Sequence, residues 1–308
     1  MTGTTPVVIV TRKLPDGVER ELAARFHAEL NASDTPMNAE VLKAAVARAG
    51  VLVPTVTDRI GPEIIAAAGP QLKLIANFGV GFNHIDVKAA SARGIAVTNT
   101  PGVLTDATAD IGMTLMLMVT RRAVEGSNLL HAGQFPGWCP TWLMGVSLRG
   151  KTLGIVGMGR IGEAMGLRAS AFGMAIHYHN RKRVAPETEN ALGATYWPDL
   201  DAMLGAMDIV SIHAPYTPQT YHLFSAERIA RMKPSAYLIN TARGEIVDEA
   251  ALADALASGR LAGAGLDVFE HEPKVHPTLL GLTNVALLPH LGSSTIEART
   301  GMGNKVIA

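Results

Sequence analysis

The sequence predicts an α/β protein with two doubly wound, parallel-sheet domains. Short apolar runs rich in Val and Ile alternate with stretches of helical periodicity along most of the chain. These runs contain few polar residues, which is typical of parallel strands covered by helices on both faces. A glycine motif at Gly157–Gly162 lies between an apolar run and a helical stretch, as expected at the start of a second such domain.

Length and charge restrict the class of protein. The 308 residues are enough for about two domains, each with its own core. The 27 Lys and Arg residues balance the 27 Asp and Glu residues, so nothing indicates a nucleic-acid partner. The single Cys139 fits a reducing compartment, and no basic region precedes the first apolar run, so we expect a cytoplasmic protein. The longest apolar run, Ile111–Val119, is too short to cross a membrane.

The first hundred residues are expected to form the first sheet and its helices. The breaker Thr100-Pro101-Gly102 then marks a domain boundary. The expected strands are 6–10, 51–54, 72–78 and 94–98, and the expected helices are 17–30, 62–68 and 87–93.

A long helix is expected from Thr105 to Arg122. It is apolar on nearly all sides, so it must be buried between domains or between subunits. The loop that follows, 133–150, carries Trp138 and Trp142.

The second half is expected to form one continuous domain, 102–284. The first domain is then discontinuous, with residues 1–101 joined by 285–308, whose last part is expected to be helical. The expected strands are 151–156, 174–178, 208–213, 236–240, 262–268 and 284–288, and the expected helices are 163–172, 200–207, 226–232 and 249–258.

The glycine motif predicts a dinucleotide-binding turn. Gly157 permits the tight turn, Gly159 lets a pyrophosphate approach the backbone, and Gly162 lets the helix pack closely on the strand. The phosphates are expected at the N-terminus of the following helix, where amide groups and the helix dipole favour an anion.

The end of the next strand indicates which nicotinamide cofactor is used. An Asp or Glu about 20 residues past the glycines binds the ribose 2′-hydroxyl of NAD. This chain instead has Asn180, Arg181, Lys182 and Arg183, which suit a 2′-phosphate. We therefore expect NADP(H) to be preferred, with NAD(H) as the alternative.

Three further loops follow strands and carry charged or titratable side chains. Arg243 follows the strand 236–240, Glu270 and Glu272 follow 262–268, and His290 follows 284–288. In an open α/β sheet the carboxyl ends of the strands line the ligand site, so these groups are expected to converge there. The spacing does not decide between Glu270 and Glu272 as the partner of His290.

At these loops the chain resembles the D-2-hydroxyacid dehydrogenase family. Within that family it is most similar to the glyoxylate/hydroxypyruvate reductases, through residues 102–110 and the Trp138 loop. The resemblance implies a flavodoxin-like substrate domain and a Rossmann cofactor domain. It is carried by the segments 79–81, 98–102, 157–162, 240–244, 263–269, 272–273 and 289–290.

The resemblance implies a role for each catalytic residue. His290 would be the general acid that protonates the carbonyl oxygen as hydride arrives. Glu272 would accept a hydrogen bond from His290 and favour the imidazolium form. Arg243 would bind the substrate carboxylate and polarise the reacting carbonyl, and the amides of Val80 and Gly81 would hold the same carboxylate.

The resemblance also implies the cofactor contacts. Asp267 would accept a hydrogen bond from the nicotinamide carboxamide, and Thr108 would lie near the nicotinamide. The pyrophosphate would be lined by Met158, Arg160 and Ile161. The remaining implied contacts are Ala214, Pro215, Thr241, Ala242, His290 and Gly292 to the cofactor, and Val56 and Trp138 to the substrate.

The implied substrate is a small 2-oxoacid or 2-hydroxyacid. The loop 55–58 offers no cation for a phosphorylated substrate, with Arg59 the nearest, and the Trp138 loop is bulky and apolar. We therefore expect NADPH-dependent reduction of glyoxylate or hydroxypyruvate by a homodimer. The alternatives are an NADH-dependent dehydrogenase of another D-2-hydroxyacid and a non-catalytic, dinucleotide-sensing protein of the corepressor type. Formate oxidation is disfavoured, because an enzyme with that activity is expected to have a neutral residue in place of Glu272.

Overall fold

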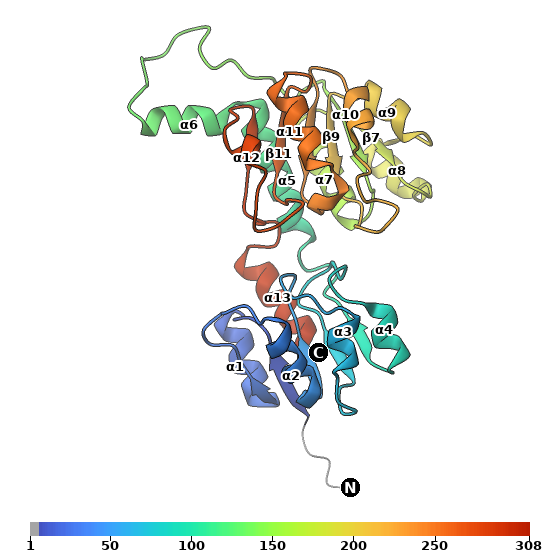
Figure 1. Cartoon of the computed structure of the whole chain (residues 1–308). Helices are drawn as coiled ribbons and strands as arrows, with labels where there is room; N and C mark the ends of the chain where they lie inside the picture. The colour runs from blue at the N-terminus through green and yellow to red at the C-terminus, as the bar shows by residue number, and fades with distance from the viewer. Residues whose placement is uncertain (1–5) are drawn as a thin grey trace. The chain divides into compact units, whose positions relative to one another are not determined.

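The computed structural model describes residues 6–308 and divides the chain into two compact units (Figure 1). Unit 1 contains the residues up to Leu104 together with Ser294–Ala308, and unit 2 is Thr105–Ser293. Each unit contains one parallel sheet, which confirms the predicted α/β class. Among the described residues, no helix has the length and hydropathy needed to cross a membrane.

Unit 1 contains a five-stranded sheet in the order β2-β1-β3-β4-β5. This 2-1-3-4-5 order is the flavodoxin-like arrangement. The strands are β1 (Val7–Val10), β2 (His27–Glu29), β3 (Val51–Val53), β4 (Leu74–Ala76) and β5 (Ala96–Thr98). The helices are α1 (Asp16–Arg25), α2 (Ala39–Arg48), α3 (Pro62–Ala66), α4 (Val87–Ala92) and α13 (Ile296–Ile307).

Local sequence signals explain where these helices begin. The side chain of Asn38 caps α2 by accepting a hydrogen bond from the amide of Val41 at 3.0 Å. Asp86 caps α4 in the same way through the amide of Ala89 at 2.9 Å. Proline stands in the first turn of α3, where its missing N–H costs no helical hydrogen bond.

The helix expected over 17–30 is shorter than predicted. It ends at Arg25, and His27–Glu29 forms β2, which pairs with β1 at the edge of the sheet. His27 is exposed and its two neighbours in β2 are only partly buried, so β2 lacks the apolar run that identifies the inner strands.

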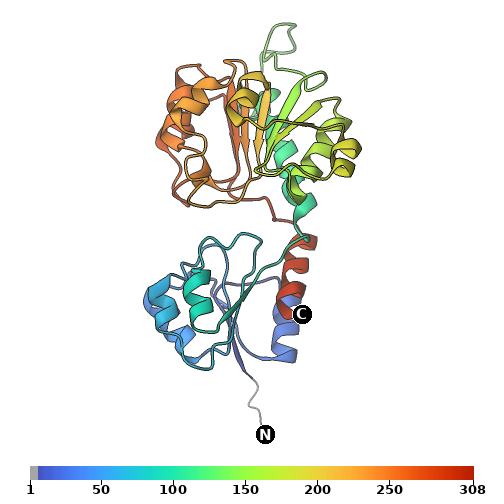
Figure 2. The same ribbon diagram turned by 90° about the vertical axis from the view of Figure 1, so that its right-hand side faces the viewer.

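Unit 2 contains a seven-stranded parallel sheet in the order β12-β11-β10-β9-β6-β7-β8 (Figure 2). The chain reverses its direction of strand addition beside β6, as in a Rossmann domain. The strands are β6 (Thr152–Val156), β7 (Ala175–His179), β8 (Thr195–Tyr196), β9 (Ile209–Ile212), β10 (Tyr237–Asn240), β11 (Gly263–Leu266) and β12 (Val285–Leu287). The helices are α5 (Thr105–Thr120), α6 (Ala123–His131), α7 (Arg160–Ala171), α8 (Pro186–Leu192), α9 (Leu200–Ala206), α10 (Ala226–Arg231), α11 (Glu249–Ala257) and α12 (Pro277–Leu280).

Both domain boundaries lie later in the chain than expected. The sequence placed residues 285–308 in the first domain, but Val285–Leu287 pairs with β11, so this strand belongs to unit 2. The second boundary therefore moves to 293/294, and the first moves from 101/102 to 104/105. The backbone N–H and C=O groups of this buried strand need hydrogen-bond partners, and β11 supplies them. This pairing decides which unit the strand belongs to, and it cannot be inferred from the local sequence.

Helix α5 packs against β11 and α7 within unit 2, where Leu115 and Met116 are fully buried. Its other face, including Ile111 and Leu117, is only partly buried. The next helix, α6, has no buried residue. In Figure 1, α6 and the loop after it extend away from the rest of unit 2. We call residues 123–147 the arm.

Candidate active site

The glycine motif forms the turn between β6 and α7, beside the point where the sheet reverses direction. Gly157 has a φ of 101°, and a Cβ there would lie 2.5 Å from the amide nitrogen of Ala214. A Cβ on Gly162 would lie 2.4 Å from the carbonyl oxygen of Gly157. Gly159 is exposed, and a Cβ there would meet no atom within 4 Å. Two glycines are therefore required by packing, whereas the third leaves open space in front of the helix N-terminus, as a pyrophosphate requires.

The side chain of Asn180, which follows β7, forms hydrogen bonds with the backbone of the glycine turn. Its Oδ1 accepts a hydrogen bond from the amide of Met158 at 2.6 Å, and its Nδ2 donates to the carbonyl of Met158 at 3.2 Å. The side chain of Met158 is buried and its amide is bonded to Asn180, while its contact with the pyrophosphate stays a prediction. Arg160 is exposed and Ile161 partly buried at the start of α7, and no side chain of the described residues caps this helix.

The three cations after β7 are not equivalent. Nε and Nη2 of Arg183 each donate to Glu189 on α8, at 2.7 Å, in a bidentate pair. Arg181 and Lys182 are exposed. The sequence predicted all three as ligands for a 2′-phosphate, but Nε and Nη2 of Arg183 donate to the carboxylate of Glu189, 6 residues further along the chain.

Two features fix the turn after β10, which carries Arg243: the hydrogen bonds of the Asn240 side chain and the close packing of Gly244. Asn240 accepts a hydrogen bond from the amide of Ala242 at 3.0 Å and donates to the carbonyl of Arg243 at 2.9 Å. A Cβ on Gly244 would lie 1.9 Å from the carbonyl carbon of Phe269, so the 240–244 turn lies directly against the loop after β11. Arg243 is partly buried, and its Nη1 donates to the carbonyl of Ala242 at 2.7 Å.

His290 and Glu272 form the central pair of the site. Nδ1 of His290 lies 2.9 Å from Oε2 of Glu272, while Oε1 of Glu272 accepts a hydrogen bond from the amide of Phe269 at 3.2 Å. Glu270 has a different partner, because its Oε1 lies 2.7 Å from Nε2 of His222. The geometry thus pairs His290 with Glu272, the choice that the resemblance had implied.

The loop that carries His290 is held by two buried side chains. Asp267 accepts hydrogen bonds from the amides of Leu291 and Gly292, at 2.6 and 2.7 Å, and Thr108 donates to the carbonyl of Gly292 at 3.0 Å. His290 itself has a φ of 57°, a left-handed conformation that is uncommon for a residue with a Cβ. Each oxygen of Asp267 therefore accepts a hydrogen bond from a backbone amide, and the implied contact with the nicotinamide carboxamide stays a prediction.

Electrostatics keep this site charged. Burial acts to raise the pKa of Glu272, but the hydrogen bond and positive charge of His290 outweigh it and leave that pKa below its ordinary value. Burial lowers the pKa of the Arg243 guanidinium, and the negative charges of Glu245 and Glu272 oppose the shift. Since arginine stays protonated in proteins, the site contains a fixed cation beside a carboxylate–imidazole pair.

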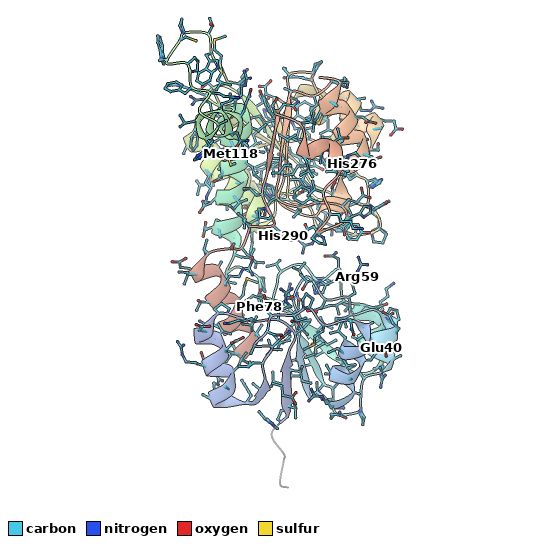
Figure 3. The ribbon with its side chains drawn as sticks, turned by 60° about the vertical axis from the view of Figure 1, so that its left-hand side comes forward. Glu40, Arg59, Phe78, Met118, His276 and His290 are labelled. Atoms are coloured by element: carbon cyan, nitrogen blue, oxygen red, sulfur yellow. The ribbon has the colours of Figure 1, made fainter. Side chains whose placement is uncertain are left out.

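These loops lie at one edge of the unit 2 sheet, because each follows the carboxyl end of a parallel strand. Figure 3 shows His290 at the end of unit 2 where α5 begins, with Met118 toward the other end of that helix. The other predicted contacts follow β9 and β10: Ala214 and Ala242 are partly buried, Pro215 is exposed, and Thr241 is buried. Among the described residues the hydroxyl of Thr241 has no hydrogen-bond partner, so it is able to bond a cofactor.

In unit 1 the predicted substrate residues lie on two loops that follow neighbouring strands. Asn77, fully buried, donates to the carbonyls of Gly79 and Gly81 at 3.0 Å and so shapes the loop that contains Val80. Val56 is 41% exposed in the loop after β3, where Asp58 accepts a hydrogen bond from the amide of Thr55 at 2.7 Å. Figure 3 labels Phe78 and Arg59 near these loops.

The arm of unit 2 exposes large apolar side chains. Trp138 is 84% exposed and Met144 is 65% exposed, while the rings of Phe135 and Trp142 stack with their centroids 5.7 Å apart. Apolar surface of this extent on one segment is typical of a protein interface.

Four residues that shape the site were not predicted. Asn77 and Asn240 each stand at the end of a strand before a glycine-containing turn, a position where an amide often fixes the turn, so the sequence offered a signal for them. His222 contacts Glu270 across 48 residues of sequence, and Glu189 contacts Arg183 from the next helix. No local pattern indicated either of them.

Comparison with known proteins agrees with this geometry. The family model described as "D-isomer specific 2-hydroxyacid dehydrogenase, NAD binding domain" matches residues 113–292. A glyoxylate reductase of Thermococcus litoralis is 46% identical over 305 residues, which cover 98% of this chain and 91% of that protein.

Two solved structures are similar over almost the whole chain. A putative D-isomer specific 2-hydroxyacid dehydrogenase from Polaromonas sp. JS6 66 has a TM-score of 0.92 and 43% identity, covering 99% of this chain and 95% of that one. An NADPH-dependent glyoxylate/hydroxypyruvate reductase from Sinorhizobium meliloti, in complex with NADP and malonate, has a TM-score of 0.88 and 37% identity, covering 99% and 92%. The chain therefore belongs to the D-isomer specific 2-hydroxyacid dehydrogenase family and is an NAD(P)-dependent dehydrogenase.

Proposed function

We propose that this protein reduces glyoxylate, and hydroxypyruvate, to the 2-hydroxyacid with NADPH. The observation that carries the proposal is the 2.9 Å contact between His290 and Glu272, with Arg243 on the turn that packs against the same loop. The names of the relatives support the substrate, since the similar archaeal proteins are glyoxylate reductases.

His290 is the proposed general acid. Because Nδ1 is engaged by Glu272, Nε2 is the nitrogen that delivers a proton to the substrate's carbonyl oxygen. The lowered pKa of Glu272 keeps its carboxylate charged at neutral pH, where it contacts Nδ1 of His290. Glu272 also fixes the direction of the ring, so that the donating nitrogen is placed before substrate binds.

Arg243 is the proposed partner of the substrate carboxylate. Its guanidinium is planar and permanently charged, so it can bind a carboxylate through two parallel hydrogen bonds and polarise the adjacent carbonyl group. The amides of Val80 and Gly81, on the loop shaped by Asn77, are the proposed second group of donors to that carboxylate. Val56 and Trp138 are proposed to limit the pocket to small substrates.

The residues after β6 and β7 fit a nicotinamide dinucleotide with a 2′-phosphate. When bound, the cofactor supplies a hydride to the carbonyl carbon. Gly159 leaves room for the pyrophosphate, the unpartnered hydroxyl of Thr241 offers a further hydrogen bond, and Arg181 with Lys182 supplies the positive charge for the phosphate. The NADP complex of the Sinorhizobium meliloti protein supports the choice of NADPH.

A homodimer is the proposed assembly. The arm carries exposed Trp138 and Met144, and α6 buries none of its residues within the chain, so a second copy is the proposed cover for this surface. Sedimentation of the wild type should give twice the mass of one chain, and Trp138→Ser with Met144→Ser should shift the equilibrium toward the monomer. A monomeric wild type at micromolar concentration would contradict the dimer.

The function is tested by steady-state reduction of glyoxylate and hydroxypyruvate with NADPH and with NADH. The proposal predicts a higher kcat/KM with NADPH, which falls in a variant that combines Arg181→Gln and Lys182→Gln, while the value with NADH changes little. A matched control replaces exposed Arg20 and Lys88 of unit 1 by Gln. Equal losses with both cofactors would point to an NADH-dependent enzyme. Tight dinucleotide binding without turnover of any 2-oxoacid would instead indicate a sensor of the corepressor type.

A further inference from the structure

We propose that Arg183 supports NADPH selectivity indirectly, by neutralising and holding Glu189, whereas Arg181 and Lys182 contact the 2′-phosphate. The inference rests on the proposed function, because it concerns the same phosphate subsite. It differs from the simplest interpretation of the sequence, in which all three cations bind the phosphate.

The first argument is the geometry of the pair. Both nitrogens of the Arg183 fork that face Glu189 donate to it, one to each carboxylate oxygen, at 2.7 Å. The hydroxyl of Tyr178 donates to the same carboxylate, and Tyr178 is fully buried. The side chain of Glu189 is only 10% exposed, although that of Arg183 is 65% exposed. For Arg183 to bind a phosphate through the same fork, it would have to leave a nearly buried carboxylate unpaired.

The second argument is that the turn 180–184 is fixed at both ends. The amide of Val184 donates to the hydroxyl of Tyr178 at 3.1 Å, and the hydroxyl of Tyr196 donates to the carbonyl of Asn180 at 3.2 Å. The Arg183 guanidinium also lies over the ring of Tyr196, 5.8 Å from its centroid. All three residues between these anchors are exposed, but Arg183 is paired with Glu189. The turn therefore presents Arg181 and Lys182 to a ligand and keeps Arg183 as part of its own structure.

The third argument is charge. Hydrogen bonds from Arg183 and Tyr178 lower the pKa of Glu189 to about 2, so this carboxylate is ionised at any physiological pH. An ionised carboxylate near the 2′-phosphate repels it, which is the reason that an acidic residue in this region favours NAD. With Arg183 in place the pair is neutral, and the positive charge of Arg181 and Lys182 acts on the phosphate without opposition.

A double-substitution cycle at Arg183 and Glu189 tests the inference. The measured quantity is the ratio of the dissociation constants of NADP⁺ and NAD⁺, obtained by calorimetric titration of the full chain. Arg183→Gln should raise this ratio about fivefold to tenfold, because Glu189 is left as an unopposed negative charge. Glu189→Gln should leave the ratio unchanged or lower it. The double variant should return to within about twofold of the wild type. If Arg183 contacts the phosphate itself, the double variant will bind NADP⁺ as weakly as Arg183→Gln, and the inference fails.

Two control comparisons make the outcome of this experiment unambiguous. If Arg183→Gln does not fold, the comparison of the double variant with the wild type decides the question. The double variant has no unpaired buried charge, so it is expected to fold. Arg25→Gln, which breaks the exposed pair with Glu21, gives the effect of losing an ion pair elsewhere. If the combined Arg181→Gln and Lys182→Gln variant leaves the ratio unchanged, the NADPH assignment itself is wrong. If that variant raises the ratio but the cycle shows no recovery, only the role of Arg183 is wrong.

Discussion

His290 and Glu272 are 18 residues apart in the sequence, and their side chains meet at 2.9 Å across two loops that follow adjacent strands. Contacts with other parts of unit 2 hold each of these loops in place. Asp267 and Thr108 hold the loop of His290, and the packing of Gly244 against Phe269 places the turn of Arg243 beside the loop of Glu272. The arrangement places an imidazole, the carboxylate that contacts it and a guanidinium on turns that these contacts hold.

The first prediction concerns the carboxylate of Glu272. Glu272→Gln removes the charged acceptor that orients the His290 ring through Nδ1, so kcat for glyoxylate should fall by roughly tenfold or more, with the dissociation constant of NADPH unchanged. Glu270→Gln is the matched control, since Glu270 contacts His222 instead. Equal kcat values in the wild type and Glu272→Gln would contradict the pairing.

The second prediction concerns the guanidinium fork. Arg243→Lys retains the positive charge but loses the planar pair of donors, so kcat/KM for glyoxylate should fall roughly 10²- to 10³-fold. Binding of NADPH, followed by its fluorescence, should remain close to that of the wild type. A lysine variant with nearly full activity would show that charge alone is sufficient and that the bidentate contact is absent.

The third prediction separates the glycines. Gly162→Ala places a Cβ 2.4 Å from a backbone oxygen, so the backbone must shift and the free energy of unfolding should fall by about 1–3 kcal/mol. Gly159→Ala meets no atom of the protein, so its urea midpoint should equal that of the wild type while its affinity for NADPH falls. Equal losses of stability in the two variants would contradict the open space at Gly159, and an unchanged affinity of Gly159→Ala for NADPH would contradict the pyrophosphate subsite there.

The fourth prediction concerns His213, at the carboxyl end of β9. Burial lowers the pKa of His213 to about 4 from its ordinary 6.5, so the unfolded chain binds more protons between these values. Stability from this group is therefore present above pH 6.5 and is lost as the pH falls toward 4, by at most about 1.4 kcal/mol per pH unit. His213→Gln should flatten that part of the stability curve, measured by urea unfolding from pH 4 to 7. His27→Gln, at an exposed position, should not, and equal curves for wild type and His213→Gln would contradict the assignment.

Much of this architecture could be predicted from sequence because parallel, buried strands are continuous apolar runs. Strand β6 and the glycines after it are a strong example, since each glycine has a separate steric reason. Strand β2 was missed because an edge strand of three partly exposed residues lacks such a run. Strand β12 was identified but assigned to the wrong domain, since the partner of a strand is not a local property.

For the site, too, the sequence predicted the residues on each loop but not the partners that hold them. The residues proposed to carry the chemistry lie on loops that follow strands, and the sequence predicted His290, Glu272 and Arg243 at one sheet edge. The partners that hold these loops lie on other elements. Nothing near Arg183 indicates that Glu189 engages it from the next helix, and nothing near Asp267 indicates that its oxygens bind the amides of Leu291 and Gly292.

The most direct test of the account is the rate of NADPH oxidation by glyoxylate in the wild type and in His290→Ala. The account predicts turnover by the wild type and a loss in kcat of roughly 10²- to 10⁴-fold in the variant, with the same urea midpoint and the same affinity for NADPH. An unchanged rate in His290→Ala would give the role of general acid to another group. A wild type that binds NADPH tightly but turns over no 2-oxoacid would contradict the assignment of a reductase.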